Sequence, residues 1–236
     1  MSGFRLSFPA CVIAGKTCIA AEDITLLRQY TFAEGIRSSA DVVTILALNA
    51  ACPEKCPEWA DFFVKSLTDY ILRHCYPHGS LDAANADWLM RVFATDGVAN
   101  SPLELDLILH VMAVSPFVPD SLSAFAIDQL RLALTDRIGG YHEVRPTNAP
   151  GVTVHDLDYV LQILRGSFAR GNRALSAAEI AVLRRIDCET PGNAHHRAWH
   201  DMIAAIDRGQ HPHQPERPAR WLRVPDAYFV EDHKVA

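Results

Sequence analysis

Three histidines lie within six residues of this sequence, at positions 195, 196 and 200. His196 and His200 are four residues apart, a spacing that places both imidazoles on one face of a helix. Zinc takes three or four nitrogen, sulfur or oxygen ligands, so this pair is a candidate for half of a zinc site. His211 and His213, further along the chain, could complete it. The alternative is that these histidines are surface side chains in the first turn of an ordinary helix.

The cysteines suggest a second zinc site. Cys52 and Cys56 frame the segment CPEKC, and pairs of zinc-binding cysteines have this kind of spacing. His74, Cys75 and His78 could supply the other ligands. The alternative is a loop with two ordinary thiols. We expect no disulfides, because a chain of 236 residues can bury a core without covalent cross-links.

Two carboxylates form a third group of candidate ligands. Asp96 stands in an Asp-Gly loop, and Glu104 follows Ser101 by three residues at the start of an apolar helical pattern. They could hold a divalent cation or contact a basic group of a partner. The alternative is structural, with Asp96 shaping the turn and Glu104 completing a capping box with Ser101. An EF-hand is excluded, because the positions of such a loop that need oxygen ligands carry apolar side chains.

No motif of a common catalytic site accompanies these residues. The sequence has no GxSxG nucleophile elbow, no P-loop, no GxGxxG loop and no HExxH zinc motif. We therefore expect a protein that is not an enzyme and that has no cofactor.

The net charge of the chain is −6 at pH 7 with histidine neutral. An acidic chain has no electrostatic reason to bind nucleic acid or an anionic membrane. No apolar run approaches the roughly 18 residues of a membrane span. We expect a cytoplasmic protein whose partner is another protein. The alternative function is binding of a divalent metal ion, through the loop carboxylates or through the histidine and cysteine clusters.

Helical periodicity dominates the chain and predicts an all-α helical bundle. Apolar side chains recur every three to four residues in nine segments: 22–34, 40–52, 58–75, 85–94, 102–114, 121–138, 155–169, 177–189 and 197–209. Ser38, Ser101 and Ser176 each stand three residues before an acid at the start of such a segment, which predicts N-terminal helix caps.

The helices recur as a repeated helix–loop–helix unit. Phe-Ala, a glycine and a capped helix follow one another three times, from Phe32, Phe93 and Phe168. The first and third copies are the most similar, and their paired positions are Asp23 with Asp156, Asn49 with Asp187, and Trp59 with Trp199. We predict that these two units are duplicates and that their Trp-x-Asp segments are structural.

The repeats predict a division of the chain into five parts. The ranges are a first unit at 1–78, a middle unit at 79–138, a linker at 139–151, a third unit at 152–207 and a Pro-rich tail at 208–236.

The segment VFATDGVANSPLELDLI, residues 92–108, resembles the signature of the tellurite-resistance TerB-like helical family. In that family an alanine shortly before an Asp-Gly loop is followed by Ser-x-x-Glu at the start of the next helix. The duplicated pattern is also similar to that of alphaproteobacterial proteins associated with this fold. The resemblance implies an all-helical bundle, a link to stress or metal responses, and metal binding by loop carboxylates. The middle unit keeps the acidic residues Asp96 and Glu104, whereas Glu34 and Arg170 stand in the other two loops.

Overall fold

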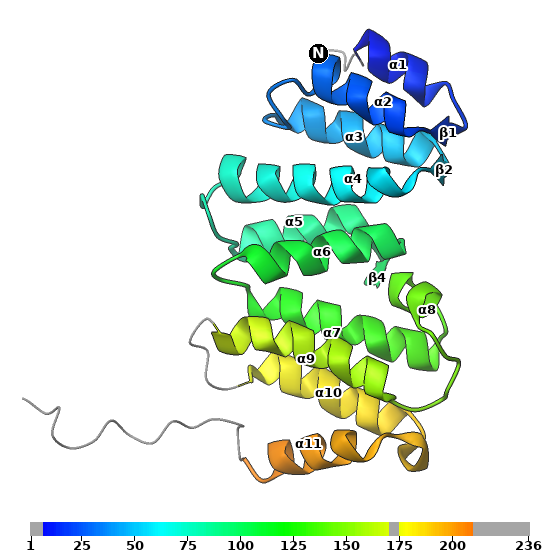
Figure 1. The fold of residues 1–236 in the computed structure, drawn as a ribbon. Coiled ribbons are helices and arrows are strands. Elements are labelled where there is room, and N and C mark those ends of the chain that lie inside the picture. The colour runs from blue at the N-terminus through cyan, green and yellow to red at the C-terminus, as the bar shows by residue number, and fades with distance from the viewer. Residues whose placement is uncertain (1–6, 170–174, 210–236) are drawn as a thin grey trace, which may run out of the picture.

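The structure is a computed structural model that describes residues 7–169 and 175–209 (Figure 1). In chain order its elements are α1 (Phe8–Ala14), β1 (Cys18–Ile19), α2 (Ala21–Leu26), η1 (Leu27–Thr31), α3 (Ser39–Ala51), β2 (Glu54–Lys55), α4 (Pro57–Asp69), η2 (Tyr70–His74), α5 (Ala83–Phe93), β3 (Ala94–Thr95), β4 (Val98–Ala99), α6 (Pro102–Val114), α7 (Asp120–Thr135), α8 (Gly140–Val144), α9 (Val154–Ala169), α10 (Ala177–Glu189), η3 (Gly192–Ala194) and α11 (Arg197–Asp207). The π-helical turns η1 and η2 continue α2 and α4, and η3 is a 3₁₀ turn. The described residues therefore form an all-α fold, as the helical periodicity predicts.

Each of the nine predicted helical segments contains a helix, and two further helices, α1 and α8, were not predicted. The start of α1 has a recognisable signal, because the Ser7 hydroxyl accepts the Ala10 N–H and Pro9 lies in the first turn. Helix α8 lies within residues 139–151, the segment that the sequence predicts to be a linker. This segment is rich in glycine and proline, which favours a linker, and α8 begins at the second of its glycines, Gly140.

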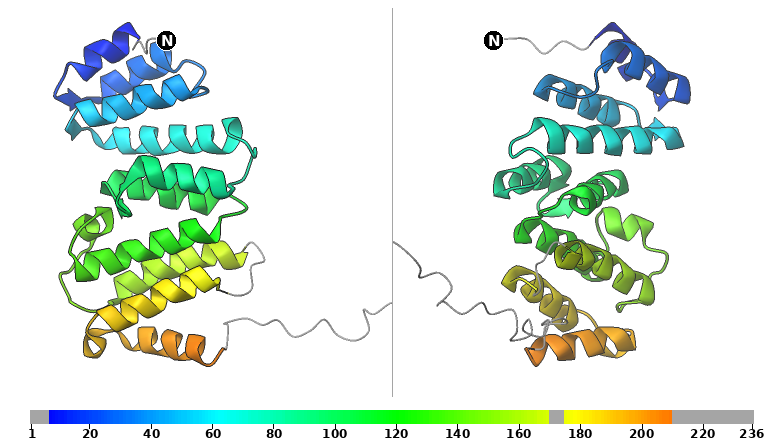
Figure 2. Two further views of the ribbon diagram at one scale, coloured as in Figure 1. Left: turned by 180° about the vertical axis from the view of Figure 1, so that it is seen from behind. Right: turned by 60° about the vertical axis from the view of Figure 1, so that its left-hand side comes forward.

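The helices stack in two layers along an elongated molecule (Figures 1 and 2). In one layer α2 contacts α4, α4 contacts α6, and α6 contacts both α8 and α9. In the other layer α1 contacts α3, α5 contacts α7, and α7 packs along α10, while α11 covers the far end against α10. The largest fully buried side chains include Trp59, Trp199, Phe63 and Phe93. Within the described ranges, no helix has the length and apolar composition needed to cross a membrane.

The three predicted helix caps are confirmed. Ser38 and Ser176 form reciprocal capping boxes with Asp41 and Glu179. The Ser101 hydroxyl accepts the Glu104 N–H and donates to the Glu104 carboxylate, as the Ser38 hydroxyl does with Asp41. These caps satisfy backbone N–H groups that the first turn of each helix leaves without intrahelical partners.

A buried tryptophan ties the second helix to the third in both the first and the third unit. The Trp59 Nε1–H donates to Asn49 Oδ1 at 3.0 Å, and the Trp199 Nε1–H donates to Asp187 Oδ1 at 2.9 Å. In the middle unit Leu122 follows its cap serine at the spacing that Trp59 has in the first unit, and it is also buried. The first and third units thus make the same contact at the positions that the sequence pairs. Their origin by duplication stays a prediction.

The acids of the two Trp-x-Asp segments do not take part in this contact. Asp61 and Asp201 are exposed and pair with Lys65 and Arg197 on their own helices. The prediction that these segments are structural is therefore correct for the tryptophans and wrong for the aspartates.

In the first and third units, a backbone hydrogen bond joins the segment before α2 or α9 to the loop before α4 or α11. The Cys56 N–H donates to the Ile19 carbonyl at 2.9 Å, and the His196 N–H donates to the Val152 carbonyl at 2.8 Å. Because α2 follows Ile19 and α9 follows Val152, this bond joins the first helix of the unit to the entrance of its last helix.

In the first and third units a buried aspartate caps the helix α2 or α9. Asp23 accepts the Ala20 N–H at 3.0 Å, and Asp156 accepts the Thr153 N–H at 2.8 Å. Asp23 also pairs with Lys16, whose side chain is nearly half exposed. The two carboxylates therefore occupy matching positions in different electrostatic surroundings.

Arg145 and Asp156 form an ion pair that is almost fully buried, with 3% and 0% of the side chains exposed. Arg145 Nε and one terminal nitrogen donate to the Asp156 carboxylate at 2.8 Å, and the guanidinium also donates to the carbonyls of Ala149 and Gly151. Tyr141 donates its hydroxyl to Asp156 at 3.0 Å. Burial alone would raise the pKa of Asp156, but the hydrogen bonds from Arg145 and its own cap lower it below the ordinary value.

We expect Asp156→Ala to destabilise the protein by about 3–5 kcal/mol, because it leaves the buried Arg145 guanidinium without a counter-charge. Asp23→Ala is the matched control at the equivalent position, and it should cost less because Lys16 remains in contact with water. Urea unfolding monitored by circular dichroism measures both changes. Equal destabilisation by the two substitutions would contradict the dominant role of the Arg145–Asp156 pair.

Candidate functional site

The predicted carboxylate ligands Asp96 and Glu104 have separate structural roles. Asp96 (φ 51°) and Gly97 (φ 81°) are the two loop residues between the paired strands β3 and β4. A two-residue hairpin loop with positive φ at both positions is a type I′ turn, for which Asp-Gly is a favoured pair. Glu104 accepts a hydrogen bond from the Ser101 hydroxyl at 3.1 Å, and burial raises its pKa. These contacts are those of a turn and a helix cap.

The two histidines predicted to bind zinc are both exposed. His196 is the N-cap of α11, where its Nδ1 accepts the Ala198 N–H at 3.2 Å. His200 lies one turn into the helix. Among the described residues, no third His, Cys, Asp or Glu joins them in a group that could hold a metal ion.

His195, which was not among the predicted ligands, is the buried histidine of the cluster. Its Nδ1 accepts the Val152 N–H at 2.9 Å, and its Nε2 lies 3.1 Å from the Thr190 hydroxyl oxygen. The Thr190 hydroxyl itself donates to the Ile186 carbonyl. Since Nδ1 accepts and Thr190 is already a donor, the imidazole is neutral and carries its proton on Nε2.

The electrostatic surroundings of His195 favour this neutral form. Burial lowers its pKa, and nearby His200 acts in the same direction, whereas Asp187 at 4.0 Å raises it by a smaller amount. The imidazole thus joins the start of α9 to the loop before α11 as a neutral hydrogen-bonding group. In the first unit Lys55 occupies the corresponding position, and β1 and β2 are joined there by backbone bonds.

The two cysteines of the CPEKC segment lie in different surroundings. Cys52 is buried and donates its thiol to the carbonyls of Ile13 and Lys16. Cys56 is half-buried at the N-cap of α4. Burial raises the pKa of both thiols, which favours their protonated form near neutral pH.

The residues suggested to complete the cysteine site are too far away. His74 ends η2 and Cys75 follows it, so the continuous helical run of α4 and η2 separates both from Cys56. At about 1.5 Å per residue this run is about 27 Å long. Cys52 and Cys56 therefore cannot share a metal ion with His74, Cys75 or His78.

Within residues 7–169 and 175–209, no three His, Cys, Asp or Glu residues come together as a metal site. His211 and His213, which the sequence suggests as completing ligands, lie outside the described residues, as does Arg170 in the third loop.

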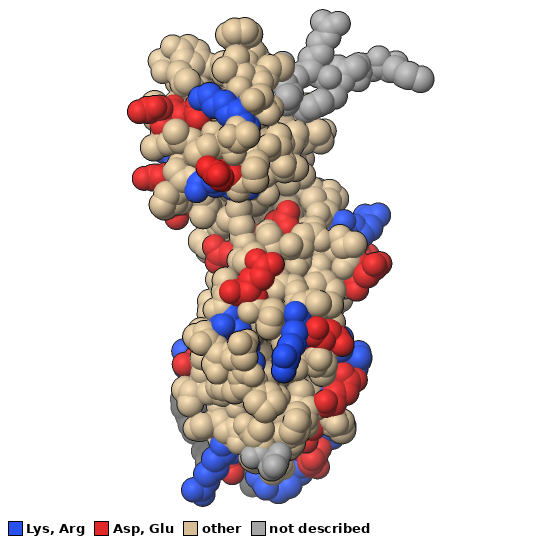
Figure 3. All heavy atoms as spheres, turned by 90° about the vertical axis from the view of Figure 1, so that its right-hand side faces the viewer, with Lys and Arg blue, Asp and Glu red and all other residues tan. Residues whose placement is uncertain are grey.

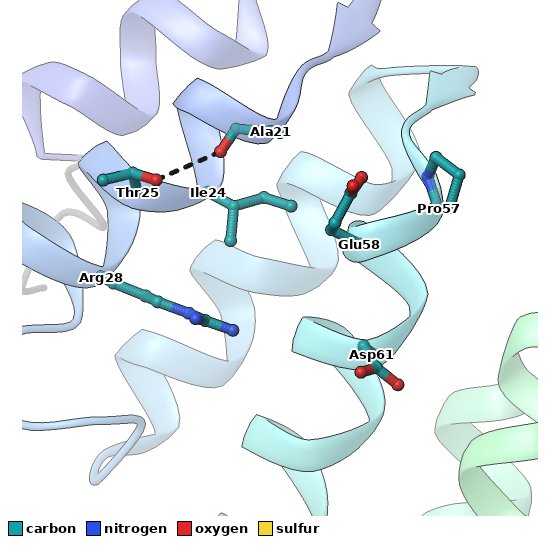
Figure 4. A pocket seen from close by; sticks show the side chains of 7 residues that line it. All are labelled: Ala21, Ile24, Thr25, Arg28, Pro57, Glu58 and Asp61. Carbon is teal, nitrogen blue, oxygen red and sulfur yellow. Dashed lines mark hydrogen bonds between the residues drawn. The ribbon is translucent and has the colours of Figure 1, made fainter.

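One of two pockets on the α2–α4–α6–α9 layer lies between α2 and α4 and has a volume of about 500 Å³ (Figure 4). We call it the charged pocket, and its lining residues are Ala21, Ile24, Thr25, Arg28, Pro57, Glu58 and Asp61. Arg28 extends from η1 towards α4, and its guanidinium lies 5.2 Å from the centre of the Phe62 ring. Glu58 and Asp61 project from successive turns of α4. A hydrogen bond from Lys65 lowers the pKa of Asp61, so this carboxylate is ionised.

The second pocket, of about 460 Å³, lies between α4, α6, α8 and α9. We call it the apolar pocket, and its lining residues are Ala60, Pro102, Leu103, Leu105, Asp106, Leu109, Tyr141, Val144 and Tyr159. The rings of Tyr141 and Tyr159 lie 4.1 Å apart. Their hydroxyls are both occupied, because Tyr141 donates to Asp156 and Tyr159 donates to the Ala126 carbonyl. Burial raises the pKa of both phenols, so neither acts as an acid or base near neutral pH.

The described lining of these two pockets has no serine, cysteine or histidine. On the face drawn in Figure 3, acidic and basic side chains are interspersed and form no continuous basic area.

The sequence analysis placed most of the pocket residues in predicted helical segments and placed Tyr141 and Val144 in the predicted linker. No local signal distinguishes a tyrosine that lines a pocket from one in the core. The charged pocket forms between helices of the first unit, and the apolar pocket forms where helices of different units meet.

Comparisons of this chain with protein-family models, with curated proteins and with solved structures each find no match.

We expect the stability of the protein to fall as the pH drops below about 6.5, because the unfolded state then binds a proton that the neutral, buried His195 does not. Above that pH this contribution is fully present. His195→Asn keeps an acceptor for the Val152 N–H and should remove the pH dependence, while the exposed His200→Ala should keep it. Thermal unfolding at several values between about pH 5 and 8 measures the effect. A slope that survives in His195→Asn would assign it to another group.

We also expect the full-length chain, purified without an affinity tag, to contain zinc well below stoichiometric amounts. The reason is that Cys52 donates its thiol to buried carbonyls, burial raises the pKa of Cys56, and His196 uses its Nδ1 in a helix cap. Elemental analysis by plasma mass spectrometry measures the content. Stoichiometric zinc that is lost in Cys56→Ser or His200→Ala would contradict this expectation and favour a metal-binding function.

Proposed function

We propose that this protein is a helical interaction module that binds a protein partner along the face formed by α2, α4, α6, α8 and α9. The observation that carries the proposal is the position of the two pockets on one layer. They open on either side of α4, with Ala60 lining one and Asp61 lining the other. Neighbouring pockets on one face of a helical stack can hold successive side chains of one partner segment.

The chemistry of the two pockets supports binding over catalysis. One offers an arginine and two carboxylates, and the other offers aliphatic and aromatic surface. Charged groups at an interface set orientation and specificity, while apolar contacts contribute most of the affinity. Both kinds of surface are present along α4.

The TerB-like resemblance of residues 92–108 supports a role in a stress response. We place that role in the cytoplasm, in keeping with six cysteines of which none forms a disulfide in the structure.

The test is a pull-down from the soluble proteome of the source cell with the immobilised full-length chain. The wild type is compared with a double variant, Asp61→Lys and Asp106→Lys, on the proposed face. Asp87→Lys on α5, in the other layer, is the matched charge control. We expect partners retained by wild type and by Asp87→Lys to be depleted about tenfold by the double variant.

Two results would overturn the proposed function. One is a set of retained proteins that is insensitive to the double variant. The other is clear turnover of a small-molecule substrate by the purified chain with no partner present.

A further inference from the structure

We infer that the apolar pocket is the docking site for a segment of a partner protein that presents a bulky apolar side chain with a lysine or arginine beside it. This inference rests on the proposed function, and it specifies the chemistry of the partner that the face recognises.

The lining of the pocket selects an apolar group. Leu103, Leu109 and Val144 present aliphatic carbon, and Tyr141 and Tyr159 present their rings. Because both phenolic hydroxyls donate to buried acceptors, neither ring offers a free donor to a polar ligand. A polar group in this pocket would lose its hydrogen bonds to water without replacement, whereas an aliphatic or aromatic side chain would lose none.

The charge on the pocket wall selects a basic neighbour. Asp106 is the one charged side chain in the described lining, it is exposed, and it makes no ion pair within the described part of the chain. A lysine or arginine next to the buried apolar group would meet this carboxylate, while an acidic neighbour would be repelled by it. The net charge of −6 acts in the same direction at longer range.

The continuity of the surface selects a chain segment rather than a small molecule. Val144 at the pocket edge is 54% exposed, so the apolar area continues outwards onto α8. On the other side, α4 presents Ala60 to the apolar pocket and Asp61 to the charged pocket. A segment that fills the first pocket and crosses α4 therefore reaches Glu58 and Asp61, where a second basic residue would find carboxylates.

The experiment uses phage that display random peptides of about 12 residues, long enough to cross one helix, selected on the immobilised full-length chain. Enriched peptides are then synthesised and titrated by fluorescence anisotropy. We expect the enriched sequences to share a bulky apolar residue beside lysine or arginine. Val144→Asp and Asp106→Lys should each weaken binding about tenfold, and Asp106→Lys should weaken peptides with more basic residues the most.

Val43→Asp is the matched control, because Val43 is an exposed valine on α3 in the other layer and should leave affinity unchanged. Enriched peptides without the apolar–basic pair, or binding that survives Val144→Asp, overturn the inference and leave the proposed function standing. Absence of any enriched peptide also overturns the inference, and the pull-down then decides the proposed function by itself.

Discussion

Burial of the Asp156 carboxylate at the start of α9 is the constraint on which the C-terminal half of the helical stack depends. A carboxylate without solvent needs a counter-charge and several donors, and Arg145 supplies the charge while Thr153 and Tyr141 supply further hydrogen bonds. The contacts between Arg145 and Asp156 hold the segment after α8 against α9. It also fixes the Tyr141 ring beside Tyr159, and these rings form one wall of the apolar pocket. The surface that we assign to partner binding is thus held in place by an ion pair beneath it.

The first and third units solve the same packing problem with different side chains. A buried indole N–H needs an acceptor, and Asn49 provides it in one unit while Asp187 provides it in the other. In both units the loop before the last helix contacts the segment before the first. In the first unit Lys55 makes this contact by backbone pairing, and in the third unit the side chain of His195 makes it. The geometry is retained because each solution satisfies the same buried donors.

These substitutions change how the units respond to their surroundings. The Lys16–Asp23 pair of the first unit is open to water on one side, whereas the Arg145–Asp156 pair of the third is closed off. Likewise, a neutral imidazole takes the place of a lysine. The third unit therefore depends on protonation and on buried charge in a way that the first does not, although both present the same helices. In a stack whose helices contact mainly their neighbours, such differences stay local.

The three-to-four-residue apolar period was sufficient to predict the all-α class and nine of the helices, because that period reflects the geometry of a single helix. Serine followed by an acid predicted the caps for the same local reason. The short helix α8 was not predicted, because the glycines and prolines of residues 139–151 indicate a linker. The burial of α8 depends on the ion pair between Arg145 and Asp156. The candidate metal ligands failed to converge for a similar reason. Spacing along the chain placed His196 and His200 on one helix and paired Cys52 with Cys56. In the structure His195 and Cys52 are instead buried and hydrogen-bonded in the interior. The charged pocket arises between α2 and α4, and the apolar pocket arises where helices from separate units meet. In both cases the lining residues are far apart in the sequence, so no short stretch of residues contains that information.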